Sequence, residues 1–134
     1  YCPAPVADVL NRIRGPFNVS LPAQAAAAAA LADTAFTERS RSHNARLRDA
    51  VTARLRALGL TVPDSQANFL LARFPGRDGR DAGAANAFLN ARGIIVRQLG
   101  AYGLADCLRI SIGTDEEMTA VLAALEAFME DPHD

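Results

Sequence analysis

The chain has 134 residues, 50% of them hydrophobic, and a formal net charge of −1. These values suit one folded domain with a sizeable buried core, and they exclude a disordered chain. The arginines are dispersed among acidic residues, so the charge balance disfavours a nucleic-acid-binding surface. All fourteen lysine-or-arginine positions hold arginine, so no residue of this chain can form a lysine Schiff base.

The two cysteines, Cys2 and Cys107, lack the spacing of metal ligands. Such a pair in a core-rich chain predicts reduced thiols, for which the cytoplasm is the default compartment. No signal peptide is recognisable, and the alanine tract at residues 25–30 is too short to span a bilayer. We therefore expect a cytoplasmic protein that binds neither nucleic acid nor a membrane.

Apolar residues near the N-terminus recur at helical spacing and predict a helix over residues 5–13, ended by Gly15-Pro16. The start at Tyr1 is abrupt, because nothing before this helix forms an element that could close a domain edge. This start predicts a truncated chain.

Ser20 is a suitable N-cap for a long helical region that we expect to run to Leu58, with Gly59 as its stop. The second half of this region has one apolar stripe, and arginines occupy the remaining arc. His43 has no second histidine or cysteine at i+4, so we expect a surface histidine rather than a metal ligand. The apolar stripe consists of Leu47, Val51, Leu55 and Leu58.

Two strands and a helix are expected next. Residues 60–62 suit an edge strand before Pro63, and residues 68–74 suit a second strand. A polar turn at 75–80 follows, and Asp81 can cap a helix that reaches Arg92.

Two short runs that each carry an arginine, Ile94–Arg97 and Cys107–Ile112, are predicted strands around a glycine-bearing loop. Alternation places Leu108, Ile110 and Ile112 on one face and Cys107, Arg109 and Ser111 on the other. If the strands pair, Arg97 and Arg109 converge beside Tyr102 and could bind an oxyanion, because a guanidinium fork matches carboxylate or phosphate.

Plainer explanations exist for each of these side chains. The arginines could be solvated on an open sheet face, and Tyr102 could pack over the glycine turn. Cys107 is more often a small buried thiol than a reactive one.

Thr114 and Glu117 form a capping box, and apolar residues keep helical spacing from there to the frayed tail that contains His133. The expected element order is α-α-β-β-α-β-β-α. This order predicts an α+β fold of two layers, a short and mainly antiparallel sheet with helices on one face.

The sequence resembles the C-terminal part of histidinol-phosphate aminotransferases, within the fold-type I pyridoxal-phosphate aminotransferases. Several motifs carry this resemblance in the family's order, and together they cover nearly the whole chain. They are Arg14–Ser20, Gln66–Leu70, Ala91–Gly93, Ile94–Arg97, Gly100–Leu104 and Leu108–Thr114 with Glu116-Glu117.

The resemblance implies that residues 21–134 are the small domain of an aminotransferase and that residues 1–20 are a helix and connector of a missing large domain. It implies substrate-binding roles for Arg109, which would bind the phosphate or carboxylate, and for Arg97 and Tyr102 beside it. The missing domain would hold pyridoxal 5'-phosphate, so no catalytic or cofactor-binding residue is expected in this chain. The intact enzyme would be a homodimer.

The implied reaction converts L-histidinol phosphate and 2-oxoglutarate to imidazole acetol phosphate and glutamate. An aminotransferase for aromatic or other amino acids is a close variant, because the clamp would accept a carboxylate as well as a phosphate. A non-catalytic α+β module that binds a small anion or a protein partner is the alternative from another class, and the absence of lysine favours it for the isolated chain.

Overall fold

The computed structural model describes residues 2–76 and 79–130. The chain divides into two compact units, residues 1–38 and residues 39–134. The tail with His133 and two residues of the predicted polar turn, Arg77 and Asp78, lie outside the described residues.

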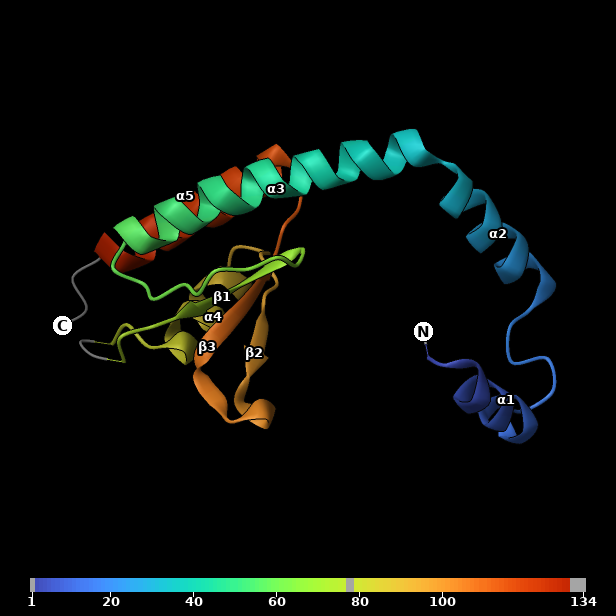
Figure 1. Ribbon diagram of the computed structural model, residues 1–134. Coiled ribbons are helices and arrows are strands. Elements are labelled where there is room, and N and C mark those ends of the chain that lie inside the picture. The colour runs from blue at the N-terminus through green and yellow to red at the C-terminus, as the bar shows by residue number, and fades with distance from the viewer. Residues whose placement is uncertain (1, 77–78, 131–134) are drawn as a thin grey trace. The chain divides into compact units, whose positions relative to one another are not determined.

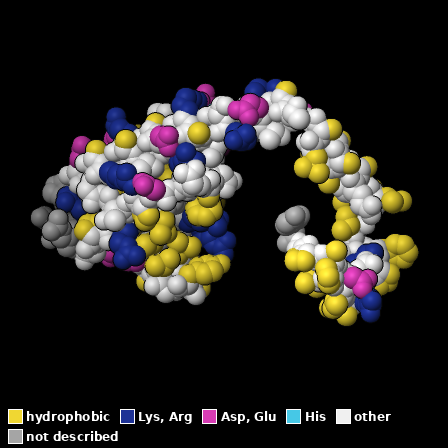
Figure 2. Space-filling model, in the orientation of Figure 1, with side chains coloured by type: hydrophobic (Ala, Val, Ile, Leu, Met, Phe, Trp, Pro, Cys, Tyr) yellow, Lys and Arg dark blue, Asp and Glu magenta, His cyan; other side chains and the backbone are white. Residues whose placement is uncertain are grey.

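The first unit contains α1 (Ala4–Ile13) and α2 (Leu21–Ala32), joined by a short connector. Ser20 caps α2 as expected, since its hydroxyl accepts a hydrogen bond from the amide of Ala23 at 3.4 Å. No residue of either helix is buried, and Figure 2 shows hydrophobic side chains over their surface. The unit therefore has no core of its own.

The helical region expected over residues 21–58 is two helices, because α2 ends before Asp33 and α3 covers Thr34–Ala57. The Asp33 carboxylate accepts a hydrogen bond from the amide of Phe36 at 2.9 Å. This side chain caps a new helix, which explains why the chain turns here instead of continuing.

A three-stranded antiparallel sheet is the centre of the second unit (Figure 1). Its strands are β1 (Phe69–Arg73), β2 (Arg97–Leu99) and β3 (Leu104–Ser111), in the spatial order β1-β3-β2. The short 3₁₀ helix η1 (Gly100–Tyr102) joins β2 to β3. Gly103 closes this connection at φ 73°, a conformation that side chains with a Cβ rarely adopt.

The core lies between one face of this sheet and the helices α3, α4 (Ala82–Asn90) and α5 (Asp115–Glu130). This arrangement confirms the α+β class. The sheet contributes Leu70, Ala72, Leu108 and Ile110 to this core, and the last two lie on the face that the alternation predicts for them. The helices contribute the predicted stripe Leu47, Val51 and Leu55, together with Ala85, Leu89, Met118, Val121, Leu125 and Phe128.

Two expected strands differ from the structure. Residues 60–62 contribute one isolated bridge, Thr61 to Arg73, because Pro63 has no amide hydrogen with which to extend the ladder. The strand expected from Ile94 begins only at Arg97, since the amide of Ile94 bonds to the carbonyl of Leu89 and still belongs to the end of α4.

Two helices in this unit begin at the predicted caps, although α4 ends at Asn90 and not at Arg92. The Asp81 carboxylate accepts a hydrogen bond from the amide of Ala84 at 2.8 Å. The capping box is reciprocal, because the amide of Glu117 donates to the Thr114 hydroxyl at 3.2 Å and the amide of Thr114 donates to the Glu117 carboxylate at 2.8 Å. α5 therefore begins where the sequence predicts.

Candidate functional site

Arg97 and Arg109 are directly opposite each other in the β2–β3 pairing. Cross-strand partners share a sheet face, and this face is the one that points away from the core. The predicted pairing therefore makes the two arginines cross-strand neighbours on one face of the sheet. Two positive charges directly opposite each other on neighbouring strands repel. An anion bound between the two arginines would relieve this repulsion.

Arg109 is half-buried on β3. Its Nε atom is buried and has no hydrogen-bond partner among the described residues. Its guanidinium carbon lies 5.2 Å from the centre of the Phe69 ring, which is within cation–π range. A buried donor without a partner is uncommon, and this one is a candidate contact for an anionic ligand.

Arg97 is exposed and contacts Tyr102, the third predicted site residue. Its Nη2 atom donates a hydrogen bond to the Tyr102 hydroxyl oxygen at 3.1 Å. The hydroxyl keeps its own hydrogen for a further acceptor, and the tyrosine side chain is 65% exposed. Tyr102 thus lies beside Arg97 and is largely exposed.

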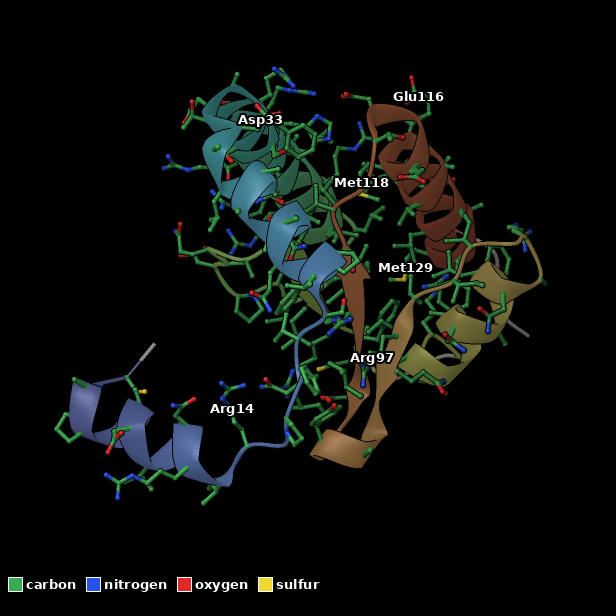
Figure 3. All side chains as sticks on the ribbon, turned by 90° about the vertical axis from the view of Figure 1, so that its right-hand side faces the viewer. Arg14, Asp33, Arg97, Glu116, Met118 and Met129 are labelled. Atoms are coloured by element: carbon green, nitrogen blue, oxygen red, sulfur yellow. The ribbon has the colours of Figure 1, made fainter. Side chains whose placement is uncertain are left out.

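A groove of about 690 Å³ has Arg97 and Arg109 among its lining residues. Residues 93–98 form one side of it, and residues from the end of β3 and the first two turns of α5 form the other. Figure 3 labels a residue from each side, Arg97 on β2 and Met118 on α5. Tyr102 is not among the lining residues. The groove combines cationic groups with an aliphatic wall, a combination typical of sites for small charged ligands.

Cys107 shares the outer face with Arg109 but does not contribute a nucleophile. The side chain is fully buried, and its thiol donates a hydrogen bond to the Asp106 carboxylate at 3.2 Å. Burial, and then the adjacent Asp106 carboxylate, raise the pKa of the thiol. The predicted buried thiol is confirmed.

His43 differs from the expectation of a surface histidine. It is half-buried, and its Nε2 atom lies 2.9 Å from the carbonyl oxygen of Gly113. The sequence holds no local signal for this contact, because 70 residues separate the two partners. Within residues 2–76 and 79–130, no group of three histidine, cysteine or acidic side chains could hold a metal ion. No helix in the described part of the chain combines the length and apolarity needed to cross a membrane.

Comparison with known proteins gives a family for this chain. Residues 1–125 match the family model of aminotransferase class I and II. The chain belongs to the class I and II aminotransferase family.

Curated relatives make the resemblance more specific. The histidinol-phosphate aminotransferase of Paramagnetospirillum magneticum is 56% identical over 129 residues, which are 96% of this chain and 36% of that protein. The histidinol-phosphate aminotransferase of Rhodospirillum centenum is 58% identical over 93% of this chain and 34% of its own length. The resemblance to this group of aminotransferases is confirmed. The chain spans about a third of the length of these relatives.

Solved aminotransferase structures have the same fold. A putative aminotransferase from Burkholderia pseudomallei superposes with a TM-score of 0.84 at 32% identity, over 96% of this chain and 38% of that one. The histidinol-phosphate aminotransferase from Sinorhizobium meliloti, solved in complex with pyridoxal-5'-phosphate, gives a TM-score of 0.80 at 31% identity, over 93% and 34%.

Proposed function

We propose that the intact polypeptide containing this chain is a pyridoxal-phosphate-dependent aminotransferase of histidine biosynthesis. Its reaction would convert L-histidinol phosphate and 2-oxoglutarate to imidazole acetol phosphate and glutamate. The arginine pair on the open sheet face is the observation that carries this proposal, together with the names of the relatives at 56% and 58% identity.

The part of the reaction that we assign to this chain is recognition of the substrate's anionic end. Arg109 would bind the phosphate of histidinol phosphate or the carboxylate of glutamate through its planar donor fork. Arg97 would bind the same anion from the opposite strand, and the Tyr102 hydroxyl could donate a third hydrogen bond. The aliphatic wall of the groove would exclude water and strengthen these electrostatic contacts.

The donor groups present here fit an anion and do not fit a covalent cofactor, since the chain has no lysine. We assign the cofactor's attachment to the remainder of the polypeptide, whose large domain would include residues 1–20, and we assign the small domain to residues 21–134. Pyridoxal phosphate held there would supply the electron sink needed to move an amino group. The arginines described here would keep the substrate oriented toward it.

We also propose that the intact enzyme is a homodimer located in the cytoplasm. Two free cysteines are consistent with a reducing compartment. Light scattering of the intact enzyme tests the dimer, and a monomer at micromolar concentration contradicts it.

Substitution of Arg109 in the intact enzyme tests the anion site. Arg109→Ala should raise KM for histidinol phosphate about 10- to 100-fold, because hydrogen bonds to charged groups contribute about 1.5–3 kcal/mol each. Arg109→Lys should restore part of this loss, since it keeps the charge but not the fork. Steady-state kinetics with histidinol phosphate and with phenylalanine measure both affinity and substrate class.

Two results would count against this proposal. An unchanged KM in Arg109→Ala, with a lowered melting temperature, would make Arg109 a structural residue. A wild-type preference for phenylalanine over histidinol phosphate would favour an aromatic amino-acid aminotransferase instead.

A further inference from the structure

One turn of α3 binds two distant segments of backbone. His43 Nε2 lies 2.9 Å from the Gly113 carbonyl oxygen, and Asn44 Nδ2 donates to the Ala67 carbonyl oxygen at 3.2 Å. A carbonyl oxygen can only accept, so the His43 Nε2 atom carries the hydrogen. Both side chains are half-buried, whereas residues 39–42 before them are exposed. This turn of α3 is thus partly shielded from solvent and contacts backbone near the sheet.

The two carbonyl groups flank the end of the β1–β3 ladder. The last Cα pair of this ladder is Phe69 with Ser111, after which the amide of Ile112 donates to the carbonyl of Asn68 at 2.8 Å. The carbonyls bound by α3 belong to the next residue on each strand. α3 therefore secures both chains at the point where their own pairing stops.

Residues of α5 also restrict the backbone that follows β3. A Cβ at Gly113 would collide with the Glu117 carboxylate, which is fixed by the amide of Thr114. Arg46, one turn further along α3, donates to both carboxylate oxygens of Asp115 at 2.8 Å each. The backbone after β3 has little freedom to shift between these contacts.

Arg109 lies on β3 two residues before the last ladder pair, so its placement depends on what holds β3. On the other side β2 supports β3 over only three residues, with an irregular register between Gln98 and Leu99. The β1 side and the α3 contacts must therefore supply most of the constraint. Binding sites require such support, because a guanidinium displaced by a fraction of an ångström loses its fork geometry.

We propose that His43 and Asn44 are positioning residues of the arginine site. They hold the Gly113 and Ala67 carbonyls, and thereby fix β3 so that Arg109 faces Arg97. This inference rests on the proposed function, in which that pair binds the substrate's anion.

The test uses the intact enzyme with pyridoxal phosphate and the variants His43→Ala, His43→Gln and Asn44→Ala. Loss of either donor should raise KM for histidinol phosphate about 3- to 10-fold, the effect of one ordinary hydrogen bond, with kcat within about twofold of wild type. His43→Gln keeps an amide donor near the Nε2 position and should restore KM. Val51→Ala is the matched control, since Val51 is a buried core residue of the same helix and binds no carbonyl.

Kinetics and amide exchange together decide the outcome. A positioning role is supported if Val51→Ala lowers the melting temperature with KM unchanged, while His43→Ala raises KM and speeds exchange at the amide of Ile112. The role is overturned if His43→Ala and Val51→Ala change KM equally, or if exchange quickens with KM unchanged.

Arg109→Ala in the same assay separates this inference from the proposed function. If that variant raises KM and the His43 variants do not, only the positioning role fails. If Arg109→Ala leaves KM unchanged, the anion site fails and the positioning role fails with it.

Discussion

Two properties of neighbouring strands place Arg97 and Arg109 side by side on the sheet. Alternation directs both side chains to the outer face, and antiparallel pairing places them opposite each other. Phe69 and Tyr102 contact the guanidinium groups without neutralising them. No carboxylate within residues 2–76 and 79–130 forms an ion pair with either arginine. At the residue scale, the pair places two positive side chains next to each other on one face of the sheet.

Cys107, two residues from Arg109, should be chemically inert in the native protein. Burial raises the pKa of its thiol, so at about pH 8 the reactive thiolate is scarce and also shielded from solvent. We expect iodoacetamide to leave Cys107 unmodified in the native intact protein and to alkylate it in concentrated urea. Peptide mass spectrometry measures both, and rapid native labelling of Cys107 would contradict the buried environment.

At the element scale, the start of α5 links a capping motif to the strand before it. Gly113 lies two residues after the end of β3. The Glu117 side chain occupies the space that a Cβ at Gly113 would need. The capping box therefore requires glycine at position 113. Any larger residue there would displace the Glu117 carboxylate and break its hydrogen bond with the amide of Thr114.

This coupling predicts a non-additive effect on stability. Gly113→Ala should cost about 1 kcal/mol of unfolding free energy, the usual value of a lost cap, and Glu117→Ala should cost a similar amount. The double variant should cost less than the sum, because both changes remove the same hydrogen bond. Urea unfolding measures the three values.

Gly100→Ala is the control for this series, since a Cβ at Gly100 meets no atom within 4 Å. It should change stability little. Full additivity of Gly113→Ala and Glu117→Ala would show that the two residues act independently.

At the scale of the whole molecule, the two units differ in how they are stabilised. Every buried side chain of the described residues lies between Leu47 and Phe128, within the second unit. The first unit exposes large apolar side chains, among them Ile13, Phe17 and Leu31, at 74%, 94% and 83%. Burial of apolar side chains is the main favourable contribution to folding. Of the two units, only the second buries such side chains in its own core.

We therefore expect residues 39–134 to fold as an isolated fragment and residues 1–38 to remain largely unfolded alone. Circular dichroism should show a cooperative thermal transition for the former and none for the latter. Leu55→Ala should destabilise residues 39–134 by about 2–5 kcal/mol, as for other large-to-small core substitutions. A non-cooperative transition in residues 39–134 would show that their core depends on residues outside them.

The sequence by itself determined the features that arise within one element. The stripe of Leu47, Val51 and Leu55, the caps at Asp81 and Thr114, and the outward face of Arg109 were all predictable, because helical and strand periodicity and side-chain caps act over a few residues. The break at Asp33 was equally local, and an aspartate followed by threonine was the signal that could have indicated it.

Only the tertiary structure decided which distant residues meet. β2 begins at Arg97 and not at Ile94, because Ile94 still bonds to the end of α4 and pairing depends on where the partner strand lies. His43 binds a carbonyl 70 residues away, a contact that no local pattern encodes. The arginine pair needed both kinds of information: alternation gave each side chain its face, and the register between β2 and β3 placed the two side chains opposite each other.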